Sequence, residues 1–229
     1  MEGIFARLKI FKIMDTLPKR IIIADDHAVV RTGLQLILDE THDLSIVDEA
    51  RNGKELLEKL CINSYDMVIL DISMPGRDSL DVLKAIKKDW PSVPIVIFSM
   101  NSNEIYEVRM LSNGASAYIN KETQPEQIIN ILRTVINGKK YISSQQAETI
   151  AEYISVQKNS IIAAHEVLTD REFQIFCLLA GGVRKTEIVR KLEISINTLS
   201  NHRNNIMKKM KMTANSELTR YALQEGIIK

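Results

Sequence analysis

The chain has 229 residues, of which 45% are hydrophobic and 26% charged, with a formal net charge of +1. This composition is ordinary for a globular protein, which argues against a disordered chain and leaves room for one large domain or, as we expect, two smaller ones. Cys61 and Cys177 lie far apart in apolar helical patterns. This favours buried thiols over a disulfide or a metal site, and fits a reducing cytosol.

Residues 1–18 are expected to be an N-terminal extension. Arg7, Lys9 and Lys12 interrupt its apolar positions and no small-residue cleavage site follows. It therefore matches neither a signal peptide nor a membrane span. Because Met14 lies just before the first convincing strand, we hypothesise that residues 1–13 come from an upstream start site.

Charge is unevenly distributed along the chain. Residues 166–229 hold eleven basic and seven acidic side chains, an excess of four positive charges, and the residues before them have an excess of three negative charges. A polyanion partner for the carboxyl end is therefore plausible, although charge alone does not establish one.

Short apolar runs alternate with amphipathic segments over residues 19–138. The central run, Met67–Leu70, is bounded by Asp66 and Pro75 and suits a strand buried on both faces. Five strand-helix units in a row predict a flavodoxin-like, doubly wound parallel sheet of order 2-1-3-4-5. The expected strands are 20–24, 45–50, 67–70, 95–98 and 117–119, and the expected helices are 28–38, 53–61, 79–88, 103–111 and 125–137.

Five polar side chains follow these strands and should meet at the carboxyl edge of the sheet: Asp25, Asp26, Asp71, Ser99 and Lys121. Three neighbouring carboxylates stay ionised only beside a cation, because burial and like charge both raise their pKa values. Mg²⁺ is the expected ion, since it prefers oxygen ligands and bridges phosphate oxygens. The lysine and the serine hydroxyl would then bind a transferred phosphoryl group.

Taken singly, these residues have plainer interpretations. The Asp25-Asp26 pair is typical of a turn or helix cap, Ser99 of a strand-end hydroxyl, and Lys121 of a solvated cation. Their shared edge is what favours a phosphoacceptor site.

Four motifs in this region resemble the receiver domain of two-component response regulators, and together they are very specific. They are Ile23-Ala24-Asp25-Asp26-His27, Leu70-Asp71-Ile72-Ser73-Met74-Pro75-Gly76, Ile97-Phe98-Ser99 and Gly114-Ala115-Ser116-Ala117-Tyr118-Ile119-Asn120-Lys121.

The resemblance implies that Asp71 is the phosphoacceptor. It also implies that Asp25, Asp26 and Asp71 hold Mg²⁺ with the backbone carbonyl of Ser73, that Ser99 and Lys121 bind the phosphoryl group, and that Tyr118 is an aromatic switch whose rotamer follows Ser99. One departure is Ser79, where such domains usually carry glycine; serine also suits the N-cap of the following helix.

Residues 139–164 are expected to be a linker that is part helical. Ala147, Ile150, Ala151 and Ile154 show helical spacing, and residues 157–160 are the expected flexible joint.

Residues 165–229 are expected to form a four-helix domain. Thr169 and Glu172 predict a capping box before an apolar stripe that includes Phe173 and Phe176. A helix over 185–192, a short turn, and a third helix from about 196 to 210 capped by Ser195 predict a helix-turn-helix.

The third helix has one apolar and one polar face. Leu199, Ile206 and Met210 share the first, and the second is rich in amides and lysines, which suit base edges and phosphates. For base contacts we expect Ser200, Asn201 and Asn204, and for phosphate contacts Arg184, Lys185, Thr198, Arg203, Lys208 and Lys209. His202 is expected to be a packing residue or to contact the backbone.

This half of the chain resembles the LuxR-type helix-turn-helix of NarL/FixJ-type regulators. The resemblance rests on Leu168-Thr169-x-Arg171-Glu172, on Glu187-Ile188 and on Ile194-Ser195-x-x-Thr198-Leu199-x-x-His202-x-x-x-Ile206-x-x-Lys209-Met210. Departures at contact positions, Ser200 and Arg184-Lys185-Thr186, mean that a sequence preference cannot be taken from relatives.

These inferences together indicate a cytoplasmic transcription regulator that is not itself an enzyme. A sensor histidine kinase would phosphorylate Asp71 with Mg²⁺, and the repacked receiver would favour a homodimer on promoter DNA, with RNA polymerase a further candidate partner and no membrane contact. Leu218, Tyr221 and Ala222 are equally compatible with a dimer seam and with plain core.

Two rivals come from other classes. One is a phosphatase with Asp71 as covalent nucleophile, which the lack of a substrate-cap insertion argues against. The other is an adaptor whose helical domain binds a protein, which salt-dependent binding to arbitrary duplex would distinguish.

Overall fold

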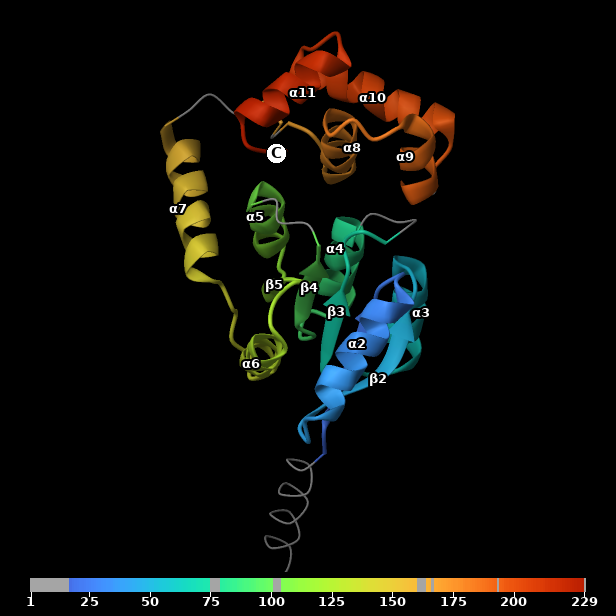
Figure 1. The fold of residues 1–229 in the computed structure, drawn as a ribbon, viewed down its shortest axis with the longest axis vertical. Helices are drawn as coiled ribbons and strands as arrows, with labels where there is room; N and C mark the ends of the chain where they lie inside the picture. Colours follow the sequence, from blue (N-terminus) through green and yellow to red (C-terminus); the bar gives the residue numbers. More distant parts are fainter. Residues whose placement is uncertain are drawn as a thin grey trace, which may run out of the picture.

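The computed structural model describes residues 17–74, 79–100, 104–159, 164–165, 167–192 and 194–228. Most of the predicted extension and the turn predicted at Pro75-Gly76 lie outside these residues. Figure 1 shows a sheet flanked by helices below a smaller helical unit, with α7 at one side.

The first unit is a five-stranded parallel sheet of order β2-β1-β3-β4-β5, as predicted. β3 and β4 are buried along their whole length, because helices cover both faces and every position must be apolar or hydrogen-bonded. The strands are β1 (Lys19–Ala24), β2 (Leu44–Ala50), β3 (Met67–Leu70), β4 (Ile95–Ser99) and β5 (Ala117–Asn120), each within one residue of its expected bounds.

Alternate strand residues point to opposite faces and build two cores. Ile21, Ile23 and their neighbours pack against α2 and α6, whereas Ile22 and Val68 pack against α3, α4 and α5. The helices are α2 (Ala28–Asp39), α3 (Gly53–Ile62), α4 (Ser79–Asp89), α5 (Glu104–Ser112) and α6 (Pro125–Ile136).

Cys61 is exposed, contrary to the prediction of a buried thiol. Leu56 and Leu60 form the buried face of α3, and the position after Leu60 turns away from the sheet. Cys177 is partly exposed, and burial raises the pKa of its thiol to about 12. Both thiols are free.

The predicted linker helix is α7 (Ser144–Asn159), which lies beside α5 (Figure 1). It continues through residues 157–159, so the part of the expected joint that the structure describes is helical. Within the described residues, no helix is long and apolar enough to cross a bilayer.

The described part of the C-terminal unit has four helices, as expected, and its second and third helices have the predicted bounds. Leu199, Ile206 and Met210 are buried on one face of α10, and Leu218 and Ala222 of α11 are fully buried in the same core. Leu218 and Ala222 are therefore core residues in this structure and not an exposed dimer seam. The helices are α8 (Asp170–Ala180), α9 (Lys185–Leu192), α10 (Ile196–Met210) and α11 (Asn215–Gln224).

A capping box starts α8, as predicted. Glu172 is buried, accepts hydrogen bonds from Thr169 N and Oγ1 at 2.8 and 3.0 Å, and pairs with Lys209 Nζ at 2.6 Å. Burial alone would raise the pKa of this carboxyl, but the Lys209 and Thr169 bonds hold it below its ordinary value.

Glu172→Gln is therefore expected to destabilise the helical unit by about 1.5 kcal/mol at neutral pH, the value of a hydrogen bond to a charged group. Because the folded pKa is depressed, the carboxylate stabilises the fold above its unfolded pKa of about 4.3 and ceases to do so as the pH falls through the folded value. Urea denaturation followed by circular dichroism should show the difference between the parent and the variant shrinking below about pH 4.3. A difference that does not change with pH would contradict this assignment.

Candidate functional site

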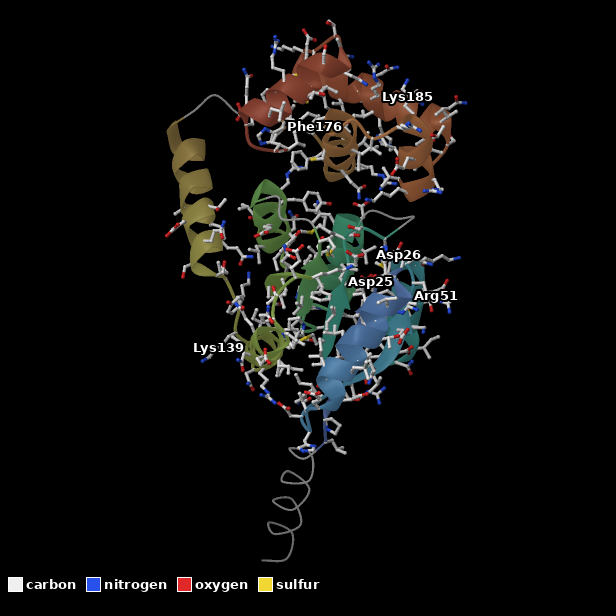
Figure 2. The ribbon with its side chains drawn as sticks, viewed as in Figure 1. Asp25, Asp26, Arg51, Lys139, Phe176 and Lys185 are labelled. Carbon is white, nitrogen blue, oxygen red and sulfur yellow. The ribbon has the colours of Figure 1, made fainter. Side chains whose placement is uncertain are left out.

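Two aspartates stand at the carboxyl ends of adjacent strands. The amide of Asp25 donates to Ala50 O at 3.0 Å and that of Asp71 to Ala24 O at 2.8 Å, so the sheet ladder itself places both residues. Both side chains are buried, while Asp26 and His27 beside them are exposed. Figure 2 shows Asp25 and Asp26 at the end of the sheet that lies nearer the helical unit.

Lys121 lies at the same edge of the sheet, where the sequence placed it, and stands between the two buried carboxylates. Its ammonium is 2.6 Å from Asp25 Oδ2 and 3.0 Å from Asp71 Oδ2, and its amide donates to Ser99 O at 2.9 Å. One cation therefore faces two buried anions. Burial raises the pKa of Asp71, and the charge of Asp25 adds to this, against the opposing effect of Lys121 and the Ser73 amide.

The acidic cluster has the donors that a hard divalent cation requires. Ligand atoms of Asp25, Asp26, His27 and Asp71 lie within 4.8 Å of one another. Asp25 Oδ2 and Asp71 Oδ2 are buried without a hydrogen bond, although both form an ion pair with Lys121. A cation with oxygen ligands would balance the remaining charge, so these residues fit such an ion.

Ser99 ends β4 and Tyr118 lies within the neighbouring strand β5, and both side chains are buried. Burial raises the pKa of the Tyr118 phenol, and a side-chain hydrogen bond with Ser99 opposes that rise. The structure thus brings the two predicted switch residues into direct contact, with the tyrosine ring turned inward.

Three supporting residues were not predicted. Arg31 is buried, donates to Asp25 O at 2.8 Å and pairs with Glu49, which holds the end of β1. His27 Nδ1 is 2.9 Å from Asp26 Oδ1. The hydroxyl of Ser79, expected as a helix cap, instead donates to Asp71 O at 3.2 Å. His27 had a signal in its motif position and Ser79 in its departure from glycine, whereas Arg31 had none.

Replacing Asp71 by Asn should stabilise the sheet unit, because it removes one of the two buried anions that share Lys121. We expect a rise in melting temperature of about 3 °C, the shift that roughly 1 kcal/mol produces in a chain of this length. The single tryptophan, Trp90, follows α4, so its fluorescence reports this unit. A lower melting temperature would contradict the charge imbalance.

The same variant should lose the stabilisation by Mg²⁺ that we expect for the parent, since binding to the folded state raises its stability. Asp66→Asn is the matched control, because Asp66 pairs with Lys19 at the other end of the sheet.

The polar face of α10 is exposed, as predicted. Asn201, Asn204, Lys208 and Ser200 all face solvent, and Thr198 closes the first turn by donating from its amide to Ser195 Oγ at 3.0 Å. Arg184 and Lys185 are exposed at the start of α9, and Figure 2 shows Lys185 at the outer side of the helical unit.

Two of the residues predicted to contact DNA phosphates bond other side chains of this chain. Lys209 is paired with Glu172, and Arg203 Nε donates to Asn215 Oδ1 at 2.8 Å. His202 is partly buried, and burial lowers the pKa of its imidazole, which agrees with a packing role.

The two units touch through α5 and α8. Phe173 of α8 is fully buried, with Arg109 Cζ 4.2 Å from its ring centroid and the Tyr106 ring stacked on it at 6.1 Å. Arg109 Nη2 also donates to Leu168 O at 3.2 Å. The helix that follows Ser99 in the chain therefore carries the contact to the helical unit.

Comparisons with known proteins agree with this geometry. Residues 21–133 match the response regulator receiver domain, and residues 166–222 match the luxR family of bacterial regulatory proteins. The oxygen regulatory protein NreC of Staphylococcus carnosus is 36% identical over 214 residues, which cover 91% of this chain and 99% of that protein.

Solved structures of RcsB from Salmonella typhimurium are also similar. One has a TM-score of 0.66 at 25% identity and covers 92% of this chain and 99% of that one. Another, bound to the promoter rprA in the presence of the phosphomimetic BeF3-, has a TM-score of 0.61 at 26% identity over 89% and 98% of the two chains.

A receiver fold with an acidic site, joined to a helix-turn-helix, defines a two-component response regulator. The chain belongs to the family of these regulators that carry a LuxR-type DNA-binding domain, together with NreC and RcsB.

Proposed function

We propose that this chain is a cytoplasmic transcription regulator switched by phosphorylation of Asp71. The observation that carries the proposal is the pairing of Lys121 with both Asp25 and Asp71 at the end of β1 and β3. In this proposal residues 19–138 are the receiver, residues 139–164 the linker and residues 165–229 the DNA-binding domain.

A phosphohistidine of a sensor kinase is the proposed donor. A carboxylate oxygen of Asp71 attacks phosphorus, the P–N bond breaks as the O–P bond forms, and the imidazole leaves. Lys121 and the Ser99 hydroxyl bind the equatorial oxygens of the transferred group, where charge is spread.

Asp25, Asp26 and Asp71 would hold Mg²⁺, with the Ser73 carbonyl as a further ligand. When bound, the ion supplies positive charge to the phosphoryl oxygens. The acidic cluster supports this assignment, because Lys121 alone leaves the site with excess negative charge.

Coupling to the second domain runs through α5. The charge of a phosphoryl group, about −1.5 to −2, would change the contact between Ser99 and Tyr118. The helix α5 follows Ser99 in the chain and contacts α8 through Tyr106 and Arg109. Movement of α5 would alter the Phe173 contact and favour a homodimer, in which two α10 helices bind half-sites about one helical turn apart.

DNA binding is proposed for the exposed face of α10 and the start of α9. Ser200, Asn201 and Asn204 would contact bases. Arg184, Lys185, Thr198, Arg203, Lys208 and Lys209 would contact phosphates, with Lys209 first leaving Glu172. RNA polymerase is a further proposed partner at promoters. The RcsB complex with promoter DNA supports this part of the proposal.

The test has two readouts. Acetyl phosphate with Mg²⁺ should add one phosphoryl group to the parent, detected by intact mass, and none to Asp71→Asn. Binding to an arbitrary duplex should weaken steeply as salt rises, because phosphate contacts release counterions. Continuous release of phosphate from small phosphoesters would instead favour a phosphatase. Failure to bind the duplex at any salt concentration would favour a protein adaptor.

A further inference from the structure

The open edge of β5 is covered by the start of the linker. β5 is the last strand of the sheet, so carbonyls on its outer side lack strand partners. Tyr141 N donates to Ser116 O at 2.9 Å, and Gln146 Nε2 donates to Tyr118 O at 3.1 Å. Ser116 and Tyr118 are two residues apart and face the same edge, so the linker runs along it.

Gln146 also reaches α5. Its Nε2 donates a second hydrogen bond to Glu107 Oε2 at 3.0 Å. Since one nitrogen bonds both acceptors, the Tyr118 carbonyl and the Glu107 carboxylate cannot be more than about 6 Å apart while both bonds exist. Both hydrogen bonds of Gln146 can therefore form at the same time only while β5 and α5 stay this close. β5 contains Tyr118, and α5 follows Ser99 in the chain.

The same side chain starts α7. Ser143 N donates to Gln146 Oε1 at 3.0 Å, and Gln146 N donates to Ser143 Oγ at 3.2 Å, which together form a capping box. All polar atoms of the Gln146 amide are thus engaged, and they tie the first turn of α7 to the receiver.

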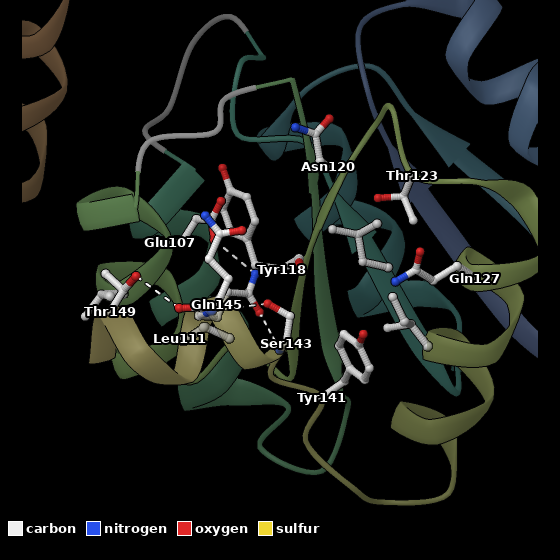
Figure 3. Close-up of a pocket in the computed structure, with 14 residues that line it drawn as sticks. Glu107, Leu111, Tyr118, Asn120, Thr123, Gln127, Tyr141, Ser143, Gln145 and Thr149 are labelled. Atoms are coloured by element: carbon white, nitrogen blue, oxygen red, sulfur yellow. Dashed lines mark hydrogen bonds between the residues drawn. The ribbon is translucent and has the colours of Figure 1, made fainter. Parts of the chain in front are cut away.

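A cavity of about 290 Å³ lies beside these bonds (Figure 3). It is lined by residues of α5, β5, α6 and the first turns of α7, among them Tyr118, Gln127 and Thr149, and by Tyr141 of the linker. This cavity separates part of the start of α7 from the sheet edge, which the Gln146 bonds span, whereas Ile150 further along the helix packs against the core.

We propose that Gln146 is a latch that holds the start of α7 on the receiver only while α5 and β5 keep their present separation. The inference rests on the proposed function for the signal that moves α5. When Asp71 is phosphorylated and α5 shifts, Gln146 loses one of its two acceptors and releases the first turn of α7. The tether between the domains then lengthens as the Phe173 contact weakens.

Hydrogen exchange of the full-length chain, measured by mass spectrometry, tests the latch directly. Without phosphodonor, amides of residues 144–150 should exchange more than about tenfold faster in Gln146→Ala than in the parent, because a hydrogen bond to a charged acceptor is lost. Glu148→Ala, an exposed position on the same helix, is the matched control and should exchange like the parent. Unchanged exchange in Gln146→Ala would overturn the latch.

A second arm adds beryllofluoride with Mg²⁺. The parent should then show the same fast exchange at residues 144–150 that Gln146→Ala shows at rest, and the variant should show no further increase. If beryllofluoride slows exchange around Asp71 in the parent but leaves exchange at residues 144–150 slow, phosphorylation does not release Gln146. A parent whose Asp71 segment does not respond at all would overturn the proposed function, while the comparison at rest still decides whether the latch exists.

Discussion

Replacing Lys121 by Met is expected to lower the free energy of unfolding of the receiver by about 3 kcal/mol, the lower end of the cost of breaking a buried ion pair. The variant leaves Asp25 and Asp71 as two buried anions without the ammonium that now lies within 3.0 Å of each. In a chain of this length the melting temperature should fall by roughly 10 °C, read from Trp90 fluorescence.

The opposite sign for Asp71→Asn makes the pair of variants decisive. Lys121→Met should lower the melting temperature and Asp71→Asn should raise it. The double variant should recover part of the loss, because only one anion remains.

Mg²⁺ should stabilise Lys121→Met more than the parent, since the ion then replaces the missing charge. Phosphorylation by acetyl phosphate should slow by about 100-fold, the loss typical for one electrostatic contact to a transition state. Equal melting temperatures for Lys121→Met and the parent would show that the ion pair is not what balances the site.

Removing the Arg109 side chain should loosen the contact between the domains. Arg109 donates to Leu168 O and lies over the Phe173 ring, and losing both contacts should cost about 2 kcal/mol. The equilibrium between touching and separated domains would then shift about 30-fold, because each 1.4 kcal/mol is a factor of ten. Small-angle scattering of Arg109→Ala without phosphodonor should show a larger radius of gyration than the parent.

Arg133→Ala is the matched control for this variant. Arg133 is also paired, with Asp43 at 2.8 Å, but at the side of the receiver away from α8. It should leave the radius of gyration unchanged. If Arg109→Ala also leaves it unchanged, the α5–α8 contact does not hold the domains together.

The sheet and the site were predictable because their signals are local. Each strand is a short apolar run, and Asp25, Asp71 and Lys121 follow such runs directly, so the parallel topology alone brings them to one edge. The bounds of α10 were equally predictable, since Ser195 marks its start and buried residues repeat along one face.

The contacts between elements gave no such signal. Arg109 and Phe173 are far apart in sequence, and their meeting depends on how α8 docks on α5, which no periodicity encodes. The predicted strand order already made β5 an edge strand, but nothing in the sequence indicated that the Gln146 side chain would bond the Tyr118 carbonyl on that edge. Cys61 was predicted to be buried because its neighbours are apolar. It directly follows the buried Leu60 in α3, and this position lies on the exposed face of the helix.

The central claim is that phosphorylation of Asp71 controls DNA binding by the second domain. The most direct measurement is the affinity of the full-length parent and of Asp71→Asn for a duplex selected from a random pool by the phosphorylated parent. Both proteins are measured with Mg²⁺, with and without acetyl phosphate. We expect the phosphodonor to tighten binding by the parent and to leave the variant unchanged. Equal affinities for both proteins under both conditions would contradict the claim and would leave the receiver as a docking or dimerisation platform only.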